Sequence, residues 1–303
     1  MLTTIQDPNF KLEADQAINE FCPEVHELDY VEHGADNIIA LVNKEFVFRF
    51  PRNEDAAKRL AYQTALLQKV SGHIQGVQTP QVIKVHNRPL YTVSAYIAGD
   101  HLSGKDIQGL PEDEQAAIGS SIADFVHQLN QSISGLEVRR LRMQAAVDGL
   151  VEPWPLYFNR LFNQIRLPNE RLRPIIQQYY VLWNDYILHE QSTYTIHDDL
   201  NSNNLLFVGP RLNGVVDFSD VNTGSIESEF RKLYVMGDGV LKAAISRYEN
   251  LAQTHVDYDH IRVWAIMQEL ARFTDRLSKQ QTETSLFKYA QENLRKWVPG
   301  FPL

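Results

Sequence analysis

The sequence predicts an α+β fold in two parts, a strand-rich first third and a larger, mainly helical remainder. Short apolar runs bounded by Pro, Asn and Gly residues are concentrated in the first hundred positions, as expected for strands joined by tight turns. After Gly99, apolar residues recur at three- and four-residue spacing, which is typical of amphipathic helices. With 303 residues, 44% of them hydrophobic, the chain can bury two sizeable cores. We therefore expect lobes of residues 1–97 and 98–303.

The first part is expected to form a small sheet with two helices. A helical pattern follows Asp7 and Pro8 and runs through Phe21. Asn53 is placed to cap a second helix over Glu54–Val70. Five further runs have the composition and turn signals of strands. The predicted strands are Asp29–Glu32, Ile38–Val42, Phe46–Phe50, Gln81–Val85 and Leu90–Ile97.

The second part is expected to be helical with a small strand insert. Predicted helices cover Glu112–Leu129, Trp154–Ile165, Asn169–His189, Ile226–Ser246 and His260–Lys279. Short strands are expected at Thr193–Ile196, Leu205–Val208 and Gly214–Phe218. Glu269 and Asp275 fall on the last helix, and we expect them on its solvated face because lone helix carboxylates are usually exposed.

Composition narrows the functional classes. A single cysteine, Cys22, excludes an internal disulfide framework and a zinc site built from thiolates. No apolar run approaches the length of a membrane span, and the first residues lack a signal-peptide pattern. The net charge of −9 disfavours nucleic acid, because neutralising phosphates needs a basic face. We therefore expect a cytoplasmic protein without a membrane or nucleic-acid partner.

One segment carries the chemistry. His197, Asp199 and Asn204 follow the pattern His-x-Asp-x-x-x-x-Asn between two apolar runs, and Asp217 ends the next run. Carboxylate and amide oxygens suit Mg²⁺ beside phosphate oxygens, and a further carboxylate can accept a proton from a hydroxyl group. The set is what phosphoryl transfer from a nucleotide requires. The alternative is a polar surface loop followed by an ordinary strand.

These residues resemble the aminoglycoside phosphotransferase family of small-molecule kinases. His197-Asp198-Asp199-Leu200 through Asn204 is similar to the family's catalytic loop, and Val216-Asp217-Phe218-Ser219-Asp220 to its metal segment. The resemblance implies a bilobal protein-kinase-like fold, with a five-stranded sheet in the N-terminal lobe and a mainly helical C-terminal lobe. It also implies ATP or GTP as co-substrate, Asp199 as catalytic base, and Asn204 and Asp217 as Mg²⁺ ligands.

The chain departs from the family pattern at two places. Asp198 stands where the catalytic loop usually has Gly, which bears on the loop backbone. Ser225 and Glu229 stand where a downstream family segment usually has acidic and Asp residues. These departures leave the packing around the loop open.

Weaker matches lie in the predicted sheet lobe. Gly34 and Asn37 resemble the turn that covers the nucleotide, where glycine lets backbone amides approach phosphate. Arg49 resembles the strand cation that binds the phosphates. The family's usual Glu partner is replaced by Gln63. The segment that contains Tyr96 and Ile97 resembles the family's hinge, where backbone groups bond the nucleotide base. The alternatives are a plain β-turn, a solvated edge Arg and a strand leaving its sheet.

The acceptor is predicted to be cationic. Between His197 and Asp238 the chain has seven acidic residues and three basic ones. Carboxylates gathered at a cleft attract amines, so Glu227 and Glu229 are predicted to bind substrate beside Asp199. An aminoglycoside antibiotic, and hence antibiotic resistance, is the leading expectation. Other acceptors considered are a macrolide, choline, a methylthio-sugar or homoserine, and another class is a non-catalytic nucleotide-binding module of the same fold.

Overall fold

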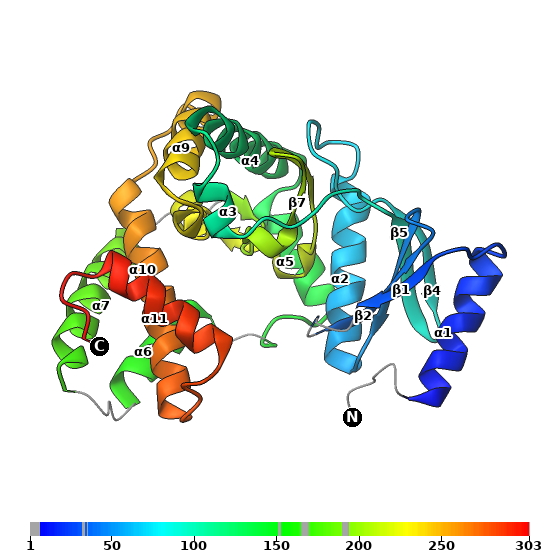
Figure 1. The fold of residues 1–303 in the computed structure, drawn as a ribbon, viewed down its shortest axis with the longest axis horizontal. Helices are drawn as coiled ribbons and strands as arrows, with labels where there is room; N and C mark the ends of the chain where they lie inside the picture. Colours follow the sequence, from blue (N-terminus) through cyan, green and yellow to red (C-terminus); the bar gives the residue numbers. More distant parts are fainter. Residues whose placement is uncertain are drawn as a thin grey trace.

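The computed structural model describes residues 7–31, 34, 36–150, 153–164, 170–189 and 194–302, with the side chains of 162–164 left out. Two lobes lie side by side, joined near the top of the view, with a sheet in the N-terminal lobe and helices dominating the C-terminal lobe (Figure 1). This arrangement confirms the predicted α+β, two-lobe fold.

Five antiparallel strands form the sheet of the N-terminal lobe, in the order β1-β2-β3-β5-β4. Their bounds are β1 Leu28–Val31, β2 Asn37–Val42, β3 Phe46–Pro51, β4 Val82–Asn87 and β5 Leu90–Ala95. Burial alternates along β2, where Ile38, Ala40 and Val42 are completely buried. Because side chains alternate between the two faces of a strand, the buried residues all lie on one face of the sheet. That face packs against α1 (Pro8–Phe21), and apolar side chains of both elements form one core. The other face is left for the cleft between the lobes.

Helix α2 (Glu54–Val70) follows β3 and stands between the sheet and the helical lobe (Figure 1). Asn53 caps it as predicted, since its side chain accepts a hydrogen bond from the Ala56 N–H at 2.9 Å. Tyr62 is completely buried in the same core as residues of the helical lobe. Its hydroxyl group donates to the Val221 carbonyl oxygen at 2.6 Å. The helix therefore fixes the position of one lobe against the other.

The C-terminal lobe contains two apolar cores. One surrounds α4 and α9, and the other packs α6 and α7 against α10 and α11. The helices are α3 Gly104–Gln108, α4 Glu112–Ser132, α5 Gly135–Gln144, α6 Trp154–Gln164, α7 Leu172–His189, α8 Ile226–Phe230, α9 Asp238–Ala252, α10 Tyr258–Ser278 and α11 Ser285–Trp297. Two short strand pairs flank the predicted catalytic loop. They are β6 (Tyr194–Ile196) with β9 (Asn222–Gly224), and β7 (Leu205–Val208) with β8 (Arg211–Val215).

Several predicted elements need correction. The helix expected over Ile226–Ser246 is broken into α8, the short 3₁₀ turn η3 (Leu233–Met236) and α9, because Gly237 adopts a φ of 103° that a helix cannot contain. The strand expected over Gly214–Phe218 ends at Val215, and Phe218 begins the 3₁₀ turn η2 (Phe218–Asp220). Helices α3, α5 and α11 and strand β9 were not predicted. Glu32, Ile165, Asn169 and Thr193, at the ends of predicted elements, lie outside the described residues.

The connection between the lobes follows the end of β5 at Ala95. Gly99 has a φ of 143° and lies so close to β7 that a Cβ there would meet the Phe207 carbonyl oxygen at 2.9 Å. Asp100 then exchanges two backbone hydrogen bonds with Phe207. The predicted boundary between residues 97 and 98 falls in this connection and stays a prediction. Within the ranges given above, no helix is long and apolar enough to cross a membrane.

Candidate active site

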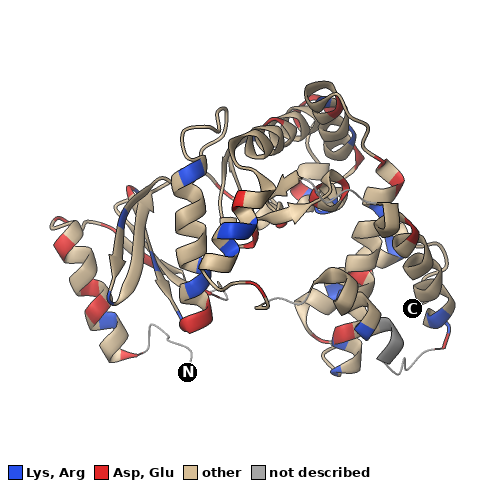
Figure 2. Cartoon of the chain, turned by 180° about the vertical axis from the view of Figure 1, so that it is seen from behind, with Lys and Arg blue, Asp and Glu red and all other residues tan. Residues whose placement is uncertain are grey.

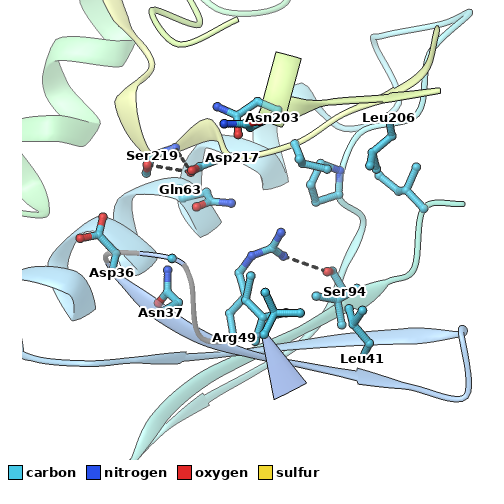
Figure 3. A pocket seen from close by; sticks show the side chains of 18 of the residues that line it. Asp36, Asn37, Leu41, Arg49, Gln63, Ser94, Asn203, Leu206, Asp217 and Ser219 are labelled. Atoms are coloured by element: carbon cyan, nitrogen blue, oxygen red, sulfur yellow. Dashed lines mark hydrogen bonds between the residues drawn. The ribbon is translucent and has the colours of Figure 1, made fainter. Parts of the chain in front are cut away.

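The lobes enclose a cavity of about 490 Å³, here called the interlobe cleft. The sheet contributes its inward face, and the helical lobe contributes the segments around η1 (Ser202–Asn204) and η2. The five residues predicted to bind nucleotide line this cleft together with both predicted metal ligands. Asn37, Arg49 and Asp217 are among the side chains labelled in Figure 3. The predicted residues are Gly34, Asn37, Arg49, Tyr96, Ile97, Asn204 and Asp217.

Arg49 points into the cleft because it alternates with the buried Phe48 and Phe50 on β3. Its Nη1 donates to the Ser94 hydroxyl oxygen at 3.2 Å (Figure 3). Gln63 lies across the cleft and supplies no charge. Among the described residues no carboxylate is within ion-pair distance of Arg49. Burial lowers the pKa of its guanidinium, and the charge of Asp217 acts in the opposite direction. A desolvated cation without a paired anion favours a phosphate ligand.

The catalytic loop runs from the end of β6 into η1. Asn204 Nδ2 donates to the backbone carbonyl oxygen and to Oδ2 of Asp199, both at 2.9 Å. With its amide nitrogen committed to Asp199, Asn204 keeps its oxygen Oδ1 for another partner. Asn204 is 8% exposed and lines the cleft. The loop thus joins the predicted base and a predicted metal ligand in one hydrogen-bonded unit.

Asp199 is held by Lys232, whose Nζ donates to Oδ1 at 2.9 Å. Burial acts to raise the pKa of Asp199, but the charge of Lys232 and its hydrogen bond outweigh burial and lower this pKa to about 2. Asp199 is therefore ionised at neutral pH. The sequence analysis did not identify Lys232, because its basic side chain sits 33 positions away and only folding brings it to the loop.

Asp217 occupies the start of η2 with a φ of 63°, a left-handed conformation that Asp tolerates better than most residues. Its Oδ1 accepts a hydrogen bond from the Ser219 hydroxyl group, with 2.8 Å between the two oxygens, so the carboxylate is oriented within the cleft (Figure 3). One carboxylate and one amide oxygen beside a phosphate site fit Mg²⁺, which takes few protein ligands and keeps phosphate and water oxygens. The described part of the chain has no group of three or more His, Cys, Asp or Glu side chains placed to hold a metal.

Glu229 does not bind substrate, contrary to the prediction. It is completely buried, and its two carboxylate oxygens accept the backbone N–H groups of His197 at 3.2 Å and Asp198 at 2.8 Å. Burial raises its pKa to about 7. Glu229 therefore fixes the catalytic loop from behind, at a place no solute reaches. Glu227 is half-buried and accepts the Asp257 N–H at 3.2 Å at the start of α10, and its substrate role stays a prediction.

Asp198 replaces the family's usual Gly and has a φ of 65°. Its carboxylate forms an ion pair with Arg231, in which Arg231 Nη2 lies 2.7 Å from Asp198 Oδ1. The same Nη2 also donates to the Asp198 carbonyl oxygen at 2.9 Å. Arg231 is 2% exposed and its guanidinium lies 5.8 and 5.5 Å from the ring centres of Trp154 and Trp264. The loop backbone is thus held by a buried cation rather than relaxed by glycine.

Two further cavities adjoin the catalytic loop. The first, of about 580 Å³, lies between the loop, α3, α10 and α11 and is here called the α11 pocket. The second, of about 860 Å³, includes Asp199 and residues of α2, α5 and α6 and is here called the α6 pocket. Arg231, Lys232 and Arg272 line both cavities. The α6 pocket is lined by both kinds of charge, since Asp148, Asp198, Asp199 and Asp220 lie beside six basic residues. Acidic and basic residues are also interspersed along the ribbon where the lobes meet (Figure 2).

Glu269 and Arg272 form part of this wall on α10. Glu269 is 2% exposed, which corrects the expected solvated position, and its Oε1 accepts Arg272 Nη1 at 2.7 Å. Asp275 on the same helix is paired with Lys279 at 2.9 Å. The α10 face toward the catalytic loop therefore presents paired charges to the cavities.

Comparison with known proteins places this geometry in context. Residues 27–277 match the family model described as the phosphotransferase enzyme family. The solved GDP and kanamycin complex of APH(2")-IIia has a TM-score of 0.76 at 18% sequence identity, covering 96% of this chain and 100% of that chain. The streptomycin-ATP-APH(2")-IIa ternary complex has a TM-score of 0.68 at 21% identity, covering 91% and 95%.

Macrolide 2'-phosphotransferase MphH from Brachybacterium faecium is similar in the same way, with a TM-score of 0.62 at 14% identity, covering 96% of this chain and 100% of that chain. At these identities the similarity concerns the fold. It confirms the predicted kinase-like architecture of a five-stranded sheet lobe and a mainly helical lobe.

Proposed function

Since the chain belongs to the phosphotransferase enzyme family, we propose that it transfers the γ-phosphoryl group of a nucleoside triphosphate to a hydroxyl group of a small molecule. The observation that carries the proposal is the convergence of Arg49, Asn204 and Asp217 on one cleft, with Asp199 bonded to Asn204 at its edge. Neighbouring structures hold GDP or ATP, and either nucleotide fits the proposal.

The proposed roles follow from the geometry. Arg49 binds the phosphates, because it is a cation facing the cleft without an ion-pair partner among the described residues. Asn204 Oδ1 and Asp217 would hold Mg²⁺, which would offset the charge that develops on the phosphates. The nucleotide would be bordered by further residues of the cleft, namely Gly34, Asn37, Tyr96 and Ile97.

Asp199 would orient the acceptor and take its proton. As the acceptor oxygen forms a bond to the γ-phosphorus, the bond from that phosphorus to the β–γ bridging oxygen breaks, and the hydroxyl proton passes to the Asp199 carboxylate. A pKa of about 2 makes this carboxylate a weak base. Its main contribution is therefore to align the hydroxyl group, and it takes the proton as the new bond reduces the basicity of the acceptor oxygen.

The acceptor is proposed only as a small molecule with a hydroxyl group. The expectation of an aminoglycoside rested in part on Glu227 and Glu229, and neither lines the cavities beside Asp199. Aminoglycosides and macrolides remain candidates because structural neighbours act on or bind them, and antibiotic resistance would follow only from activity on such a compound.

The proposal is tested by incubating the purified chain with γ-labelled ATP or GTP, Mg²⁺ and a panel of alcohols that includes kanamycin, a macrolide, choline, a methylthio-sugar and homoserine. Label is expected to appear on an acceptor, and a chelator of Mg²⁺ is expected to stop it. Tight nucleotide binding without transfer to any alcohol and without hydrolysis would contradict the proposal and favour a non-catalytic nucleotide-binding module.

A further inference from the structure

Three basic residues separate the α11 pocket from the α6 pocket. Among the described residues, these three line both pockets. They are Arg231, Lys232 and Arg272. Building on the proposed phosphoryl transfer, we propose that Lys232 and Arg272 bind an anionic group of the acceptor, a carboxylate or a phosphate, next to the hydroxyl group that Asp199 orients. The acceptor is then a small hydroxylated anion rather than a polycation.

Lys232 supplies a buried charge with spare hydrogen-bond donors. Its side chain is 11% exposed, and of its three N–H donors one bonds to Asp199 Oδ1 at 2.9 Å. Burial lowers its pKa, and the charges of Arg231 and Arg272 act in the same direction while Asp199 acts against them. An anion placed beside Lys232 would offset this repulsion among neighbouring cations.

Arg272 supplies a second cation whose position is set by α10. Its Nη1 donates to Oε1 of the buried Glu269 at 2.7 Å, which fixes the guanidinium against the helix. Its side chain is 35% exposed and reaches both cavities. A guanidinium has five N–H donors, so the pairing with Glu269 leaves most of them for an anion.

Arg231 contrasts with these two residues. Its guanidinium donates to Asp198, to the Ser228 carbonyl oxygen and to Gln268 Oε1, and it packs against two neighbouring tryptophan rings. Most of its hydrogen-bond donors are already occupied. We therefore assign Arg231 a positioning role, in which it holds the chain so that the adjacent Lys232 reaches the loop.

The carboxylates at the partition itself are each paired, although Asp220 lines the α6 pocket without an ion pair among the described residues. Asp198 is paired with Arg231, Asp199 with Lys232 and Glu269 with Arg272. An ammonium group entering here would share each of these carboxylates with a protein cation and be repelled by that cation, whereas an anion uses donors that are still available. The available donors of Lys232 and Arg272 thus favour an anionic acceptor over the cationic one expected from sequence composition.

The short distance between Lys232 and Asp199 limits the separation of the anionic group and the hydroxyl group within the acceptor. Because Lys232 Nζ lies 2.9 Å from the Asp199 carboxylate, an anion on Lys232 and a hydroxyl group on Asp199 belong to neighbouring parts of one molecule. A hydroxy acid or a phosphorylated polyol with the two groups a few bonds apart fits this spacing.

A matched series on one three-carbon skeleton tests the inference with the wild-type chain. Glycerate carries a carboxylate, glycerol 3-phosphate a phosphate, glycerol no charge and 3-amino-1,2-propanediol an ammonium group. Transfer from ATP or GTP with Mg²⁺ is expected to show a kcat/KM at least about tenfold higher for one of the anions than for glycerol or the amine, the gain of one charge-assisted hydrogen bond. The better anion identifies the carboxylate or the phosphate as the recognised group.

The outcomes separate the inference from the proposed function. If glycerol or the amine is used as well as both anions, or if kanamycin or choline is phosphorylated while both anions are ignored, the inference is wrong and the phosphotransferase function stands. If the chain neither transfers phosphate to any acceptor nor hydrolyses nucleotide, the proposed function fails, and the inference fails with it.

Substitutions on one helix provide the second arm. Arg272→Gln is expected to raise KM for the preferred anion about tenfold or more, and Arg272→Lys to retain a larger part of the affinity. Arg276→Gln, one turn further along α10 and outside both cavities, is the matched control and should leave KM unchanged. Since Arg272→Gln leaves Glu269 buried without its partner, the double substitution Glu269→Gln with Arg272→Gln must show the same increase. An unchanged KM in a folded double variant contradicts the assignment.

Discussion

The carboxylate of Asp198 lies 2.7 Å from the guanidinium of the buried Arg231, at the position where related catalytic loops usually have glycine. The positive φ that glycine would adopt freely is retained here by an Asp whose side chain is paired. Loop geometry therefore depends on an ion pair and not on a flexible residue. The pairing also sets the direction of the chain into Lys232, which bonds to Asp199.

Asp198→Gly is expected to destabilise the protein although it restores the family's usual residue. Relief of the left-handed backbone returns about 1–2 kcal/mol, whereas removing one partner of a buried ion pair costs about 3–5 kcal/mol. The net expectation is a loss of about 2 kcal/mol in the free energy of unfolding, measured by urea denaturation. A variant as stable as wild type would show that Arg231 finds equivalent partners without Asp198.

Arg49→Met is expected to weaken nucleotide binding. Arg49 faces the interlobe cleft and bonds to Ser94, and losing a charge-assisted hydrogen bond of about 1.5–3 kcal/mol raises the Kd for nucleotide by roughly 10- to 100-fold. Lys58→Met is the control, because Lys58 lies on α2 and pairs with Glu54 and Asp55 on the surface. Calorimetric titration with nucleotide measures both, and equal affinities in the two variants would remove Arg49 from the phosphate site.

Asp217→Ala is expected to remove transfer at Mg²⁺ concentrations that saturate the wild type, since Asp217 supplies the carboxylate of the proposed metal site. Ser219→Ala removes only the hydroxyl group that orients this carboxylate at 2.8 Å. A neutral hydrogen bond is worth about 0.5–1.5 kcal/mol, so this variant should lose at most about tenfold and recover partly at higher Mg²⁺. Normal Mg²⁺ dependence in folded Asp217→Ala would count against the metal site.

Glu229 predicts a pH dependence of stability. Burial raises its folded-state pKa from 4.5 to about 7, so its contribution to stability is fully present below the ordinary pKa and is lost as pH rises through about 7. Glu229→Gln stays neutral and lacks this dependence. The melting temperature of wild type should therefore fall relative to that of Glu229→Gln between about pH 5 and pH 8. Parallel pH profiles for the two proteins would contradict a raised pKa at Glu229.

Much of the site could be predicted because it is local in sequence. Asp199 and Asn204 share one loop. The β7–β8 strand pair begins directly after Asn204, and Asp217 follows its end, so short-range spacing brings the three residues together. Strand alternation also indicated that Arg49 differs from its apolar neighbours, and the structure places it in the cleft.

The errors came from long-range packing. Whether Glu229 faces solvent or the back of the catalytic loop depends on contacts 31 and 32 positions away, which periodicity does not report. Glu269 is expected on a solvated face because lone helix carboxylates are usually exposed. Its burial depends on Arg272 and on the packing of α10 against α11, which the sequence pattern does not report. The break at Gly237 had only one local signal, a glycine inside an otherwise helical pattern.

The central claim is that Asp199 acts at the acceptor hydroxyl group, and the most direct test is the single-turnover rate of phosphoryl transfer by Asp199→Asn with saturating nucleotide and Mg²⁺. The substitution keeps the shape of the side chain but removes the charge that Lys232 and Asn204 orient. The account predicts a rate lower by about 10²–10⁴-fold, with a circular dichroism spectrum and nucleotide affinity like those of wild type. A folded Asp199→Asn protein that transfers phosphate at nearly the wild-type rate would contradict the account.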